Sequence, residues 1–277
     1  MSRLWRASPL TYLALVVAAG MSLFPIWWMF VVASRSSDAM GQLPPPITPG
    51  GNLGANISRL FDNTDAYFLT GLINSTIVAG TVTVSVVFFA SLAGFAFAKL
   101  RFRGRNALLL VVIATMMVPT QLGVIPLYML MTRLHWNDRL PAVIVPALVT
   151  GFGVFMMRQY AGQAVSDELI EAARMDGCGT ARIFWHVVLP ALRPAAAVLG
   201  LLTFMTTWND FLWPYAVLND PANPTVQLSL RALSDGYYQD MSQVLTGTAI
   251  ATLPLLLVFV LFGRQIIGGI MEGAVKA

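Results

Sequence analysis

The chain has 277 residues, of which 57% are hydrophobic and only 11% are charged, and its mean hydropathy is +0.70. Roughly a quarter of the residues of a soluble domain are charged, so this composition excludes an ordinary soluble domain and predicts a chain embedded in lipid. The net charge of +4 arises from short basic clusters between apolar runs, without the continuous basic stripe that a nucleic-acid partner would require.

Six apolar stretches follow one another along the chain, and most are long enough to cross a hydrocarbon core of about 30 Å as a helix. They cover residues 10–32, 72–98, 107–131, 141–157, 195–218 and 244–262. The first is uncharged and too long for the apolar part of a signal peptide, so we expect a retained span. Because backbone groups in lipid must be satisfied internally, we predict an all-α polytopic protein with six transmembrane helices. A single transmembrane domain would then cover residues 1–277.

The basic residues predict the orientation of these spans. With both termini on the same side, twelve of the 17 lysines and arginines lie on that side and five on the other. The positive-inside rule therefore places both termini in the cytoplasm, together with segments 99–106 and 158–194. Segments 33–71, 132–140 and 219–243 are expected outside. We predict a multi-pass protein of the cell membrane.

Segment 158–194 is long, and part of it has the pattern of an amphipathic helix. Ser166 is a typical N-cap, the next two residues are acidic and suit the positive end of the helix dipole, and Gly177 suits the C′ position. We therefore expect a three-turn helix over residues 167–177. Periodicity alone leaves two roles open, a helix lying on the lipid surface and a helix that docks onto another protein.

The chain continues from this helix toward the fifth span. We expect Thr180 to cap a second short helix, which Pro190 and Pro194 would end before the fifth span begins.

The amphipathic segment also resembles a known signature. Glu171-Ala172-Ala173, then Gly177, then Leu189-Pro190 resembles the EAA loop of binding-protein-dependent importer permeases, with Val187 where that pattern has Ile. Trp208-Asn209-Asp210-Phe211 and the run from Gly268 to Lys276 are similar to the maltose-type sugar permeases. The resemblance covers about residues 70–277, and by it the chain is identified as a member of the permeases of ATP-binding-cassette (ABC) importers.

The resemblance implies a coupling helix that sits in a cleft of a cytoplasmic ATPase. It assigns this coupling role to Glu171, Ala172, Ala173, Asp176, Gly177, Leu189 and Pro190. The implied partners are a second permease subunit, a pair of ATPases and an extracellular solute-binding protein. The implied cargo is a di- or oligosaccharide, with a β-glucoside such as cellobiose as the narrower hypothesis.

The chain contains no Gly-x-x-x-x-Gly-Lys-Ser/Thr phosphate loop. We therefore expect no enzymatic activity of its own, with ATP and Mg²⁺ bound by the partner ATPase. The single cysteine, Cys178, and the widely separated His135 and His186 do not form a metal-ligand pattern, so we also expect no metal site.

Polar residues within the spans are candidates for a translocation pathway. Asp210 is the only acidic residue in a predicted span, where an uncompensated charge costs roughly 2.5–3.5 kcal/mol. Either Asn209 and Asp210 hydrogen-bond a polyol substrate, or Asp210 only reaches the outer interface. Asn74, at the start of the second span, and Gln121, in the third, are expected to face protein or the pathway, and for Gln121 a helix-helix hydrogen bond is favoured.

The residues argue against two other function classes. An ion-gradient-driven transporter or channel would need several titratable groups along a path through the helices, and only Asp210 qualifies. A membrane-embedded enzyme would need a cluster of catalytic side chains, which the sequence does not offer.

Overall fold

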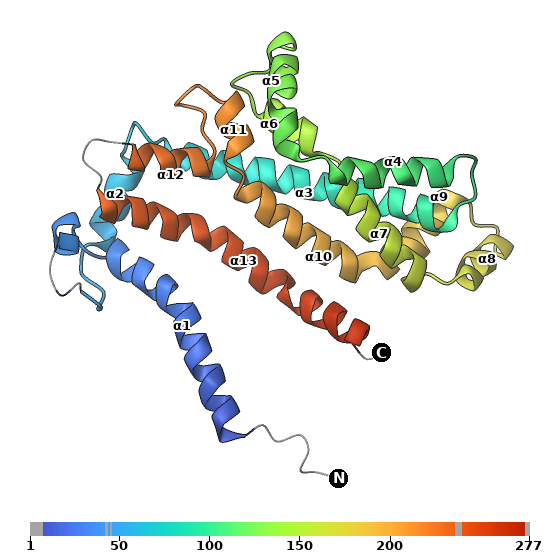
Figure 1. Cartoon of the computed structure of the whole chain (residues 1–277), viewed down its shortest axis with the longest axis horizontal. Coiled ribbons are helices and arrows are strands. Elements are labelled where there is room, and N and C mark those ends of the chain that lie inside the picture. The colour runs from blue at the N-terminus through green and yellow to red at the C-terminus, as the bar shows by residue number, and fades with distance from the viewer. Residues whose placement is uncertain (1–7, 42–43, 45, 236–239, 275–277) are drawn as a thin grey trace. The chain divides into compact units, whose positions relative to one another are not determined.

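The computed structural model describes residues 8–41, 44, 46–235 and 240–274, and every regular element among them is helical (Figure 1). The all-α prediction is therefore confirmed. The chain divides into two compact units, one of residues 1–68 with 229–253 and one of residues 69–228 with 254–277. The single membrane domain expected for residues 1–277 stays a prediction, and the two units are described separately below.

Five helical stretches of the described residues are long and apolar enough to cross a membrane, and a sixth span is possible as a bent pair. The five are Pro9–Ala33, Phe68–Lys99, Leu140–Ala164, Thr180–Trp208 and Met241–Gly263, and the bent pair is Arg105–Met117 with Thr120–Arg133. The six predicted stretches thus recur in the structure, with boundaries that differ in several places.

The first unit joins α1 (Pro9–Ala33), α2 (Leu53–Phe61), the end of α12 (Val226–Ser234) and the start of α13 (Met241–Ala274). Ser8 caps α1 by accepting a hydrogen bond from the Thr11 N–H. At the other end of α1, the Ala33 carbonyl accepts hydrogen bonds from the buried Asn56 side chain, at 2.8 Å, and from the Thr246 hydroxyl, at 3.2 Å. Most of α1 is exposed and apolar, as a lipid-facing span requires.

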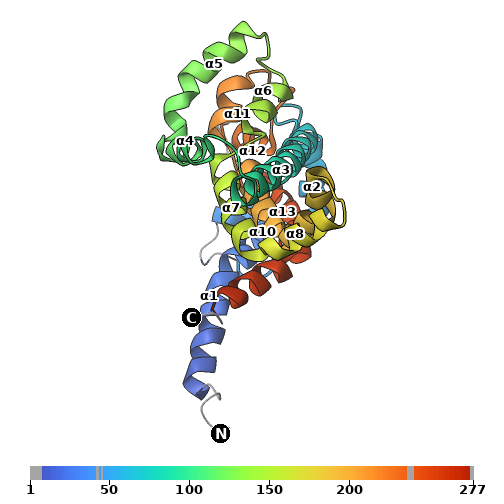
Figure 2. The same ribbon diagram turned by 90° about the vertical axis from the view of Figure 1, so that its right-hand side faces the viewer.

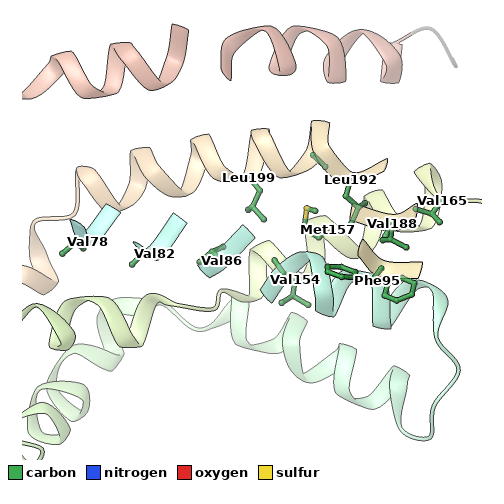
Figure 3. Close-up of a cluster of buried hydrophobic side chains, with 14 of the residues drawn as sticks. Val78, Val82, Val86, Phe95, Val154, Met157, Val165, Val188, Leu192 and Leu199 are labelled. Carbon is green, nitrogen blue, oxygen red and sulfur yellow. The ribbon is translucent and has the colours of Figure 1, made fainter. Parts of the chain in front are cut away.

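The second unit contains the core that positions the candidate site. Besides the start of α12 and the part of α13 from Pro254 on, its helices are α3 (Phe68–Lys99), α4 (Arg105–Met117), α5 (Val124–Arg133), α6 (Leu140–Ile144), α7 (Gly151–Ala164), α8 (Asp167–Met175), α9 (Thr180–Ile183), α10 (Leu189–Trp208) and α11 (Leu212–Val217). Figure 3 shows buried side chains of α3, α7 and α10 gathered in one cluster, including Val86, Met157 and Leu199. These three helices form the centre of the unit.

A glycine allows α3 and α7 to approach closely. A Cβ atom placed on Gly94 of α3 would lie 2.7 Å from the Met157 carbonyl carbon and 2.8 Å from the Arg158 nitrogen, both in the backbone of α7. Helices in lipid associate through such close contacts at small residues, because lipid chains are as apolar as the helices themselves.

The predicted third span, 107–131, is not one straight helix. The structure breaks it between α4 and α5, and the two parts are bent by 91°. Val118 ends α4 with an extended backbone, φ −83° and ψ 120°, directly before Pro119. A proline disfavours the helical conformation of the residue before it, which explains why α4 stops at this point.

The expected boundary before the fifth span is wrong. The helix that starts at Thr180 continues to Trp208 through a π-helical turn, Phe184–Val188, and Pro190 lies at the start of α10 and Pro194 inside it. The π-helical turn comes directly before Pro190, which has no N–H to donate to the preceding turn. The helix therefore continues through Pro190 and Pro194 without ending. Gly179, not Thr180, occupies the N-cap position of α9.

The predicted span 195–218 is also interrupted, because α10 ends at Trp208 and α11 begins at Leu212.

Candidate functional site

The predicted amphipathic helix is present as α8, and it begins where the sequence predicts. Ser166 has an extended backbone, and its hydroxyl accepts a hydrogen bond from the Leu169 N–H at 3.4 Å. Asp167 and Glu168 occupy the first turn and Arg174 the last. The negative charges therefore lie at the positive end of the helix dipole and the positive charge at its negative end, which is favourable. The helix ends at Met175, two residues before the predicted limit.

The end of α8 is a Schellman motif. Gly177 has φ +78°, and its N–H donates to the Arg174 carbonyl at 2.9 Å, while the Cys178 N–H donates to the Ala173 carbonyl at 2.9 Å. These two bonds satisfy carbonyls that the last turn would otherwise leave unpaired. Residues with a side chain are strained at this backbone conformation, which is why glycine suits the position.

The two faces of α8 have different surroundings. Ile170 is 5% exposed and belongs to the buried core of the second unit, with Ala173 and Cys178 packed against that core. On the opposite side Leu169 is 54% exposed and Met175 is 88% exposed. Glu171, Ala172, Asp176 and Gly177 are exposed as well. The helix is thus anchored by one face, and it presents apolar and acidic side chains on the other.

An ion pair that was not predicted ties α8 to α3. The Lys99 Nζ lies 2.7 Å from the Asp167 Oδ1, and the Lys99 side chain is only 9% exposed. This hydrogen bond and the charge of Lys99 hold the pKa of the Asp167 carboxyl below its usual value. The last residue of one span is therefore joined to the first residue of α8, at the end of the unit that faces the viewer in Figure 2.

Leu189 and Pro190, the other part of the signature, belong to a different helix from α8. They open α10, where Leu189 is partly buried and packs against the core, and Pro190 is exposed. They directly follow the π-helical turn, inside the continuous helical stretch Thr180–Trp208. Coupling roles for these two residues and for Glu171 to Gly177 stay predictions.

The proposed pathway residues Asn74 and Asn209 are both joined to the segment 223–227. The Asn74 side chain is buried and donates to the Asn223 Oδ1 and the Pro224 carbonyl, each at 2.8 Å. Asn209 ends α10, and its Oδ1 accepts a hydrogen bond from the Gln227 side chain at 3.4 Å. In this structure Asn74 therefore holds a loop, while Asn209 is exposed.

The other two pathway candidates lie at breaks in the spans. Asp210 is partly exposed and lies between α10 and α11, and its N–H donates a hydrogen bond to the Thr207 carbonyl at 3.3 Å. Gln121 lies in the short 3₁₀ turn, Thr120–Gly123, at the bend between α4 and α5, and it is exposed. Neither position is the middle of a continuous helix, and a pathway role for both remains a prediction.

Asp138 fixes the segment 217–223, which includes the Asn74 partner Asn223, and the sequence reasoning missed this residue. Its N–H donates to the Val217 carbonyl at 2.9 Å, its carboxylate accepts from the Asp220 N–H at 2.9 Å, and its carbonyl accepts from the Asn223 side chain at 2.7 Å. Asp138 has φ +61°, a conformation that aspartate tolerates better than most residues. The Asn-Asp pair at 137–138 was the available signal for such a turn.

Three comparisons with known proteins bear on this site. The family model described as "Binding-protein-dependent transport system inner membrane component" matches residues 86–267. The chain is 32% identical over 256 residues to the arabinooligosaccharides transport system permease protein AraQ of Bacillus subtilis (strain 168), covering 92% of this chain and 90% of that protein. It is 33% identical over 265 residues to the lactose transport system permease protein LacG of Rhizobium radiobacter, covering 96% and 95%.

A more distant relative and a solved structure extend the comparison. The sn-glycerol-3-phosphate transport system permease protein UgpE of Yersinia enterocolitica is 29% identical over 267 residues, covering 94% of this chain and 95% of that protein. A crystal structure of a bacterial ABC transporter involved in the import of the acidic polysaccharide alginate matches with a TM-score of 0.79. That match covers 92% of this chain and 94% of the other at 23% identity, and it concerns the fold alone.

Proposed function

Because the chain belongs to the family of binding-protein-dependent transport system inner membrane components, we propose that it forms part of the import pathway for a di- or oligosaccharide. As a multi-pass permease subunit of this family it is a transport protein rather than an enzyme. Membership of this family argues against the alternative hypothesis of an ion-gradient-driven transporter or channel.

The observation that supports ATP-driven coupling is the arrangement of α8. One face packs into the core through Ile170, the first residue is paired with Lys99, and the opposite face exposes Leu169, Glu171 and Met175. A partner protein can shift the membrane helices only through an element that contacts both the partner and these helices. The contacts of that element must differ between the two states of the partner. An anchored helix with a free face meets this requirement.

The partner proposed for this face is a cytoplasmic ATPase dimer, which would bind ATP and Mg²⁺. In this arrangement Glu171 is the polar contact, Ala172 permits close approach, and Gly177 sets the turn that ends the helix. A second permease subunit and an extracellular solute-binding protein complete the proposed importer. The family description, which names binding-protein-dependent transport, supports this set of partners.

The proposed cargo is a sugar because two relatives that align over most of their length are named for arabinooligosaccharides and for lactose. A β-glucoside such as cellobiose is the narrower proposal, and it rests only on the sequence resemblance. Asn209 and Asp210 are the side chains proposed to hydrogen-bond the hydroxyl groups of the sugar. Uptake assays with labelled cellobiose, lactose and arabinooligosaccharides in cells expressing the importer distinguish these substrates.

Charge reversal at Glu171 tests the coupling proposal. The Glu171→Lys variant is expected to reduce co-purification of the ATPase by at least about tenfold, which corresponds to about 1.4 kcal/mol, and to abolish substrate-stimulated ATP hydrolysis. Glutamate and lysine have similar helix propensities, so α8 itself should persist. The measurements are pull-down of the ATPase with the full-length permease in detergent and ATP hydrolysis with and without substrate.

Asp65→Lys is the matched control, because Asp65 is also an exposed acidic residue but lies in a segment expected outside the cell. It makes the same change in net charge and should leave both measurements at the wild-type level. If Glu171→Lys also leaves ATPase binding and hydrolysis unchanged, α8 is a lipid-surface helix and the proposed coupling is wrong.

The proposed orientation has its own test. Fusions of alkaline phosphatase and of green fluorescent protein after Ala277 are expected to give fluorescence without phosphatase activity, because the positive-inside rule places the C-terminus in the cytoplasm. Fusions within residues 45–60 should give the opposite result. An active phosphatase at the C-terminus would contradict the twelve-to-five division of basic residues on which the orientation depends.

A further inference from the structure

The loop between α3 and α4 contains a hollow that the proposed function does not use. It has a volume of about 420 Å³ and is lined by Arg101, Phe102, Gly104, Arg105, Asn106 and Ala107. Two of the six lining residues are arginines, one is an amide and none is acidic. A small polar hollow with this lining is suited to an anion.

The charge of this loop is only partly balanced within the chain. Four of the seven residues from Lys99 to Arg105 are basic and none is acidic. Lys99 is paired with Asp167, but across the described residues Arg101, Arg103 and Arg105 form no ion pair with a carboxylate. The guanidinium of Arg105 instead donates a long hydrogen bond of 3.4 Å to the Leu100 carbonyl. Three positive charges therefore remain in this loop, and those of Arg101 and Arg105 line the hollow.

The backbone adds to the positive potential at the same place. Gly104 has φ +82° and is the N-cap of α4, so no side chain accepts the free N–H groups of the first turn. That first turn also contains no acidic residue. Helix N-termini favour anions, and here the helix end reinforces the two arginines that line the hollow.

The position of the loop selects the source of the anion. It connects Lys99, the last residue of the candidate span α3, with Arg105, the first residue of the bent candidate span formed by α4 and α5. We therefore infer that the hollow lies near the level at which these two segments leave the lipid. Phe102 lines it and is 41% exposed, as expected for an aromatic side chain at the level of the lipid headgroups. Phosphate is the anionic group that this layer supplies at high local concentration.

We propose that the hollow formed by residues 101–107 binds the phosphate group of an anionic phospholipid. The guanidinium of Arg101 or Arg105 donates paired hydrogen bonds to the phosphate oxygens, and the first turn of α4 contributes its N–H groups. The bound lipid also holds the loop next to Lys99, which is the residue joined to α8. The proposal requires only that the chain spans a membrane, and it does not depend on the ATPase or on the sugar.

The test compares lipid binding by wild-type and variant full-length protein in detergent. Native mass spectrometry measures binding as phosphatidylglycerol, phosphatidylcholine or inorganic phosphate is added. We expect wild-type protein to prefer phosphatidylglycerol over phosphatidylcholine. Arg101→Gln with Arg105→Gln should weaken phosphatidylglycerol binding about thirtyfold, from about 1 kcal/mol per basic residue near an anionic surface.

Arg133→Gln with Arg139→Gln is the matched control, because it removes the same charge from the last residue of α5 and the N-cap of α6. It should retain wild-type binding. Arg101→Lys with Arg105→Lys keeps the charge without the planar fork and should bind with intermediate affinity, which separates lipid binding from a folding defect.

Several results would overturn the proposal. Equal binding of the two lipids, or equal losses in the control variant, would mean that no specific site exists. Displacement of phosphatidylglycerol by millimolar inorganic phosphate would assign the hollow to a soluble phosphate compound. If the glutamine variant kept its lipid binding but lost the ATPase in pull-down, the loop would be a protein contact instead.

Discussion

Replacing Gly94 by alanine is expected to sharply lower the amount of folded protein in the membrane. The new Cβ would lie 2.7 Å from the Met157 carbonyl carbon and 2.8 Å from the Arg158 nitrogen. Both are backbone atoms of α7, so no side-chain rotation can relieve the contact, and α3 and α7 must move apart. Overpacking of this kind typically costs about 1–3 kcal/mol and occasionally more.

Gly80→Ala provides the matched control for Gly94→Ala. Gly80 lies in the same helix, and a Cβ at that position meets no atom within 4 Å. Alanine is also the better helix former, by about 1 kcal/mol, so this variant should be as stable as the wild type or more so. The measurements are protein levels in membranes and thermal unfolding in detergent. Equal unfolding temperatures for the two variants would show that α3 and α7 are not in close contact at Gly94.

Replacing Gly177 by valine is expected to uncouple transport while the protein still accumulates. Gly177 has φ +78°, and no other atom lies within 4 Å of a Cβ built on it, so the effect comes from backbone strain alone. The left-handed conformation costs roughly 1–2 kcal/mol for a residue with a side chain, and more for a β-branched one. The Schellman motif should open, and the exposed end of α8, which carries Met175, should lose its fixed position.

Gly179→Val is a close control for this change. Gly179 is two residues away and equally open, but its backbone is extended, with φ −71° and ψ 161°, a conformation that valine adopts readily. We expect near-normal sugar uptake and substrate-stimulated ATP hydrolysis from Gly179→Val, and a large loss of both from Gly177→Val. Similar behaviour of the two variants would mean that the left-handed turn at Gly177 does not matter for coupling.

The parts of the fold that were predicted correctly are those determined by local sequence. The start of α8 follows from Ser166 and the acidic residues after it, and its end follows from Gly177, so its limits required no knowledge of distant contacts. The six apolar stretches follow from the requirement that backbone groups in lipid be satisfied. The bend after Val118 was also encoded locally, by Pro119, but continuous hydrophobicity concealed it.

The parts that were missed depend on contacts between distant residues. Lys99 and Asp167 are 68 positions apart, and nothing in their local sequences indicates that they pair. Asn74 was expected to face protein or the pathway, and its partners in the structure are Asn223 and the Pro224 carbonyl, about 150 residues away. Sequence patterns show that such a side chain needs a partner but not which one it has.

The attachment of α8 to the end of α3 has a geometric consequence. Asn74 and Lys99 are 25 residues apart in one helix, which at 1.5 Å per residue separates them by about 38 Å. If α3 tilts as a rigid rod by about 10° when α8 is pulled through Lys99, its far end moves by about 7 Å, given that helix rise. Asn74 holds the segment 223–224 and Ser75 holds Val226, so this loop would move with it. Under this condition, a rotation of about 10° at the Lys99 end would displace the Asn74 end by more than one helical turn.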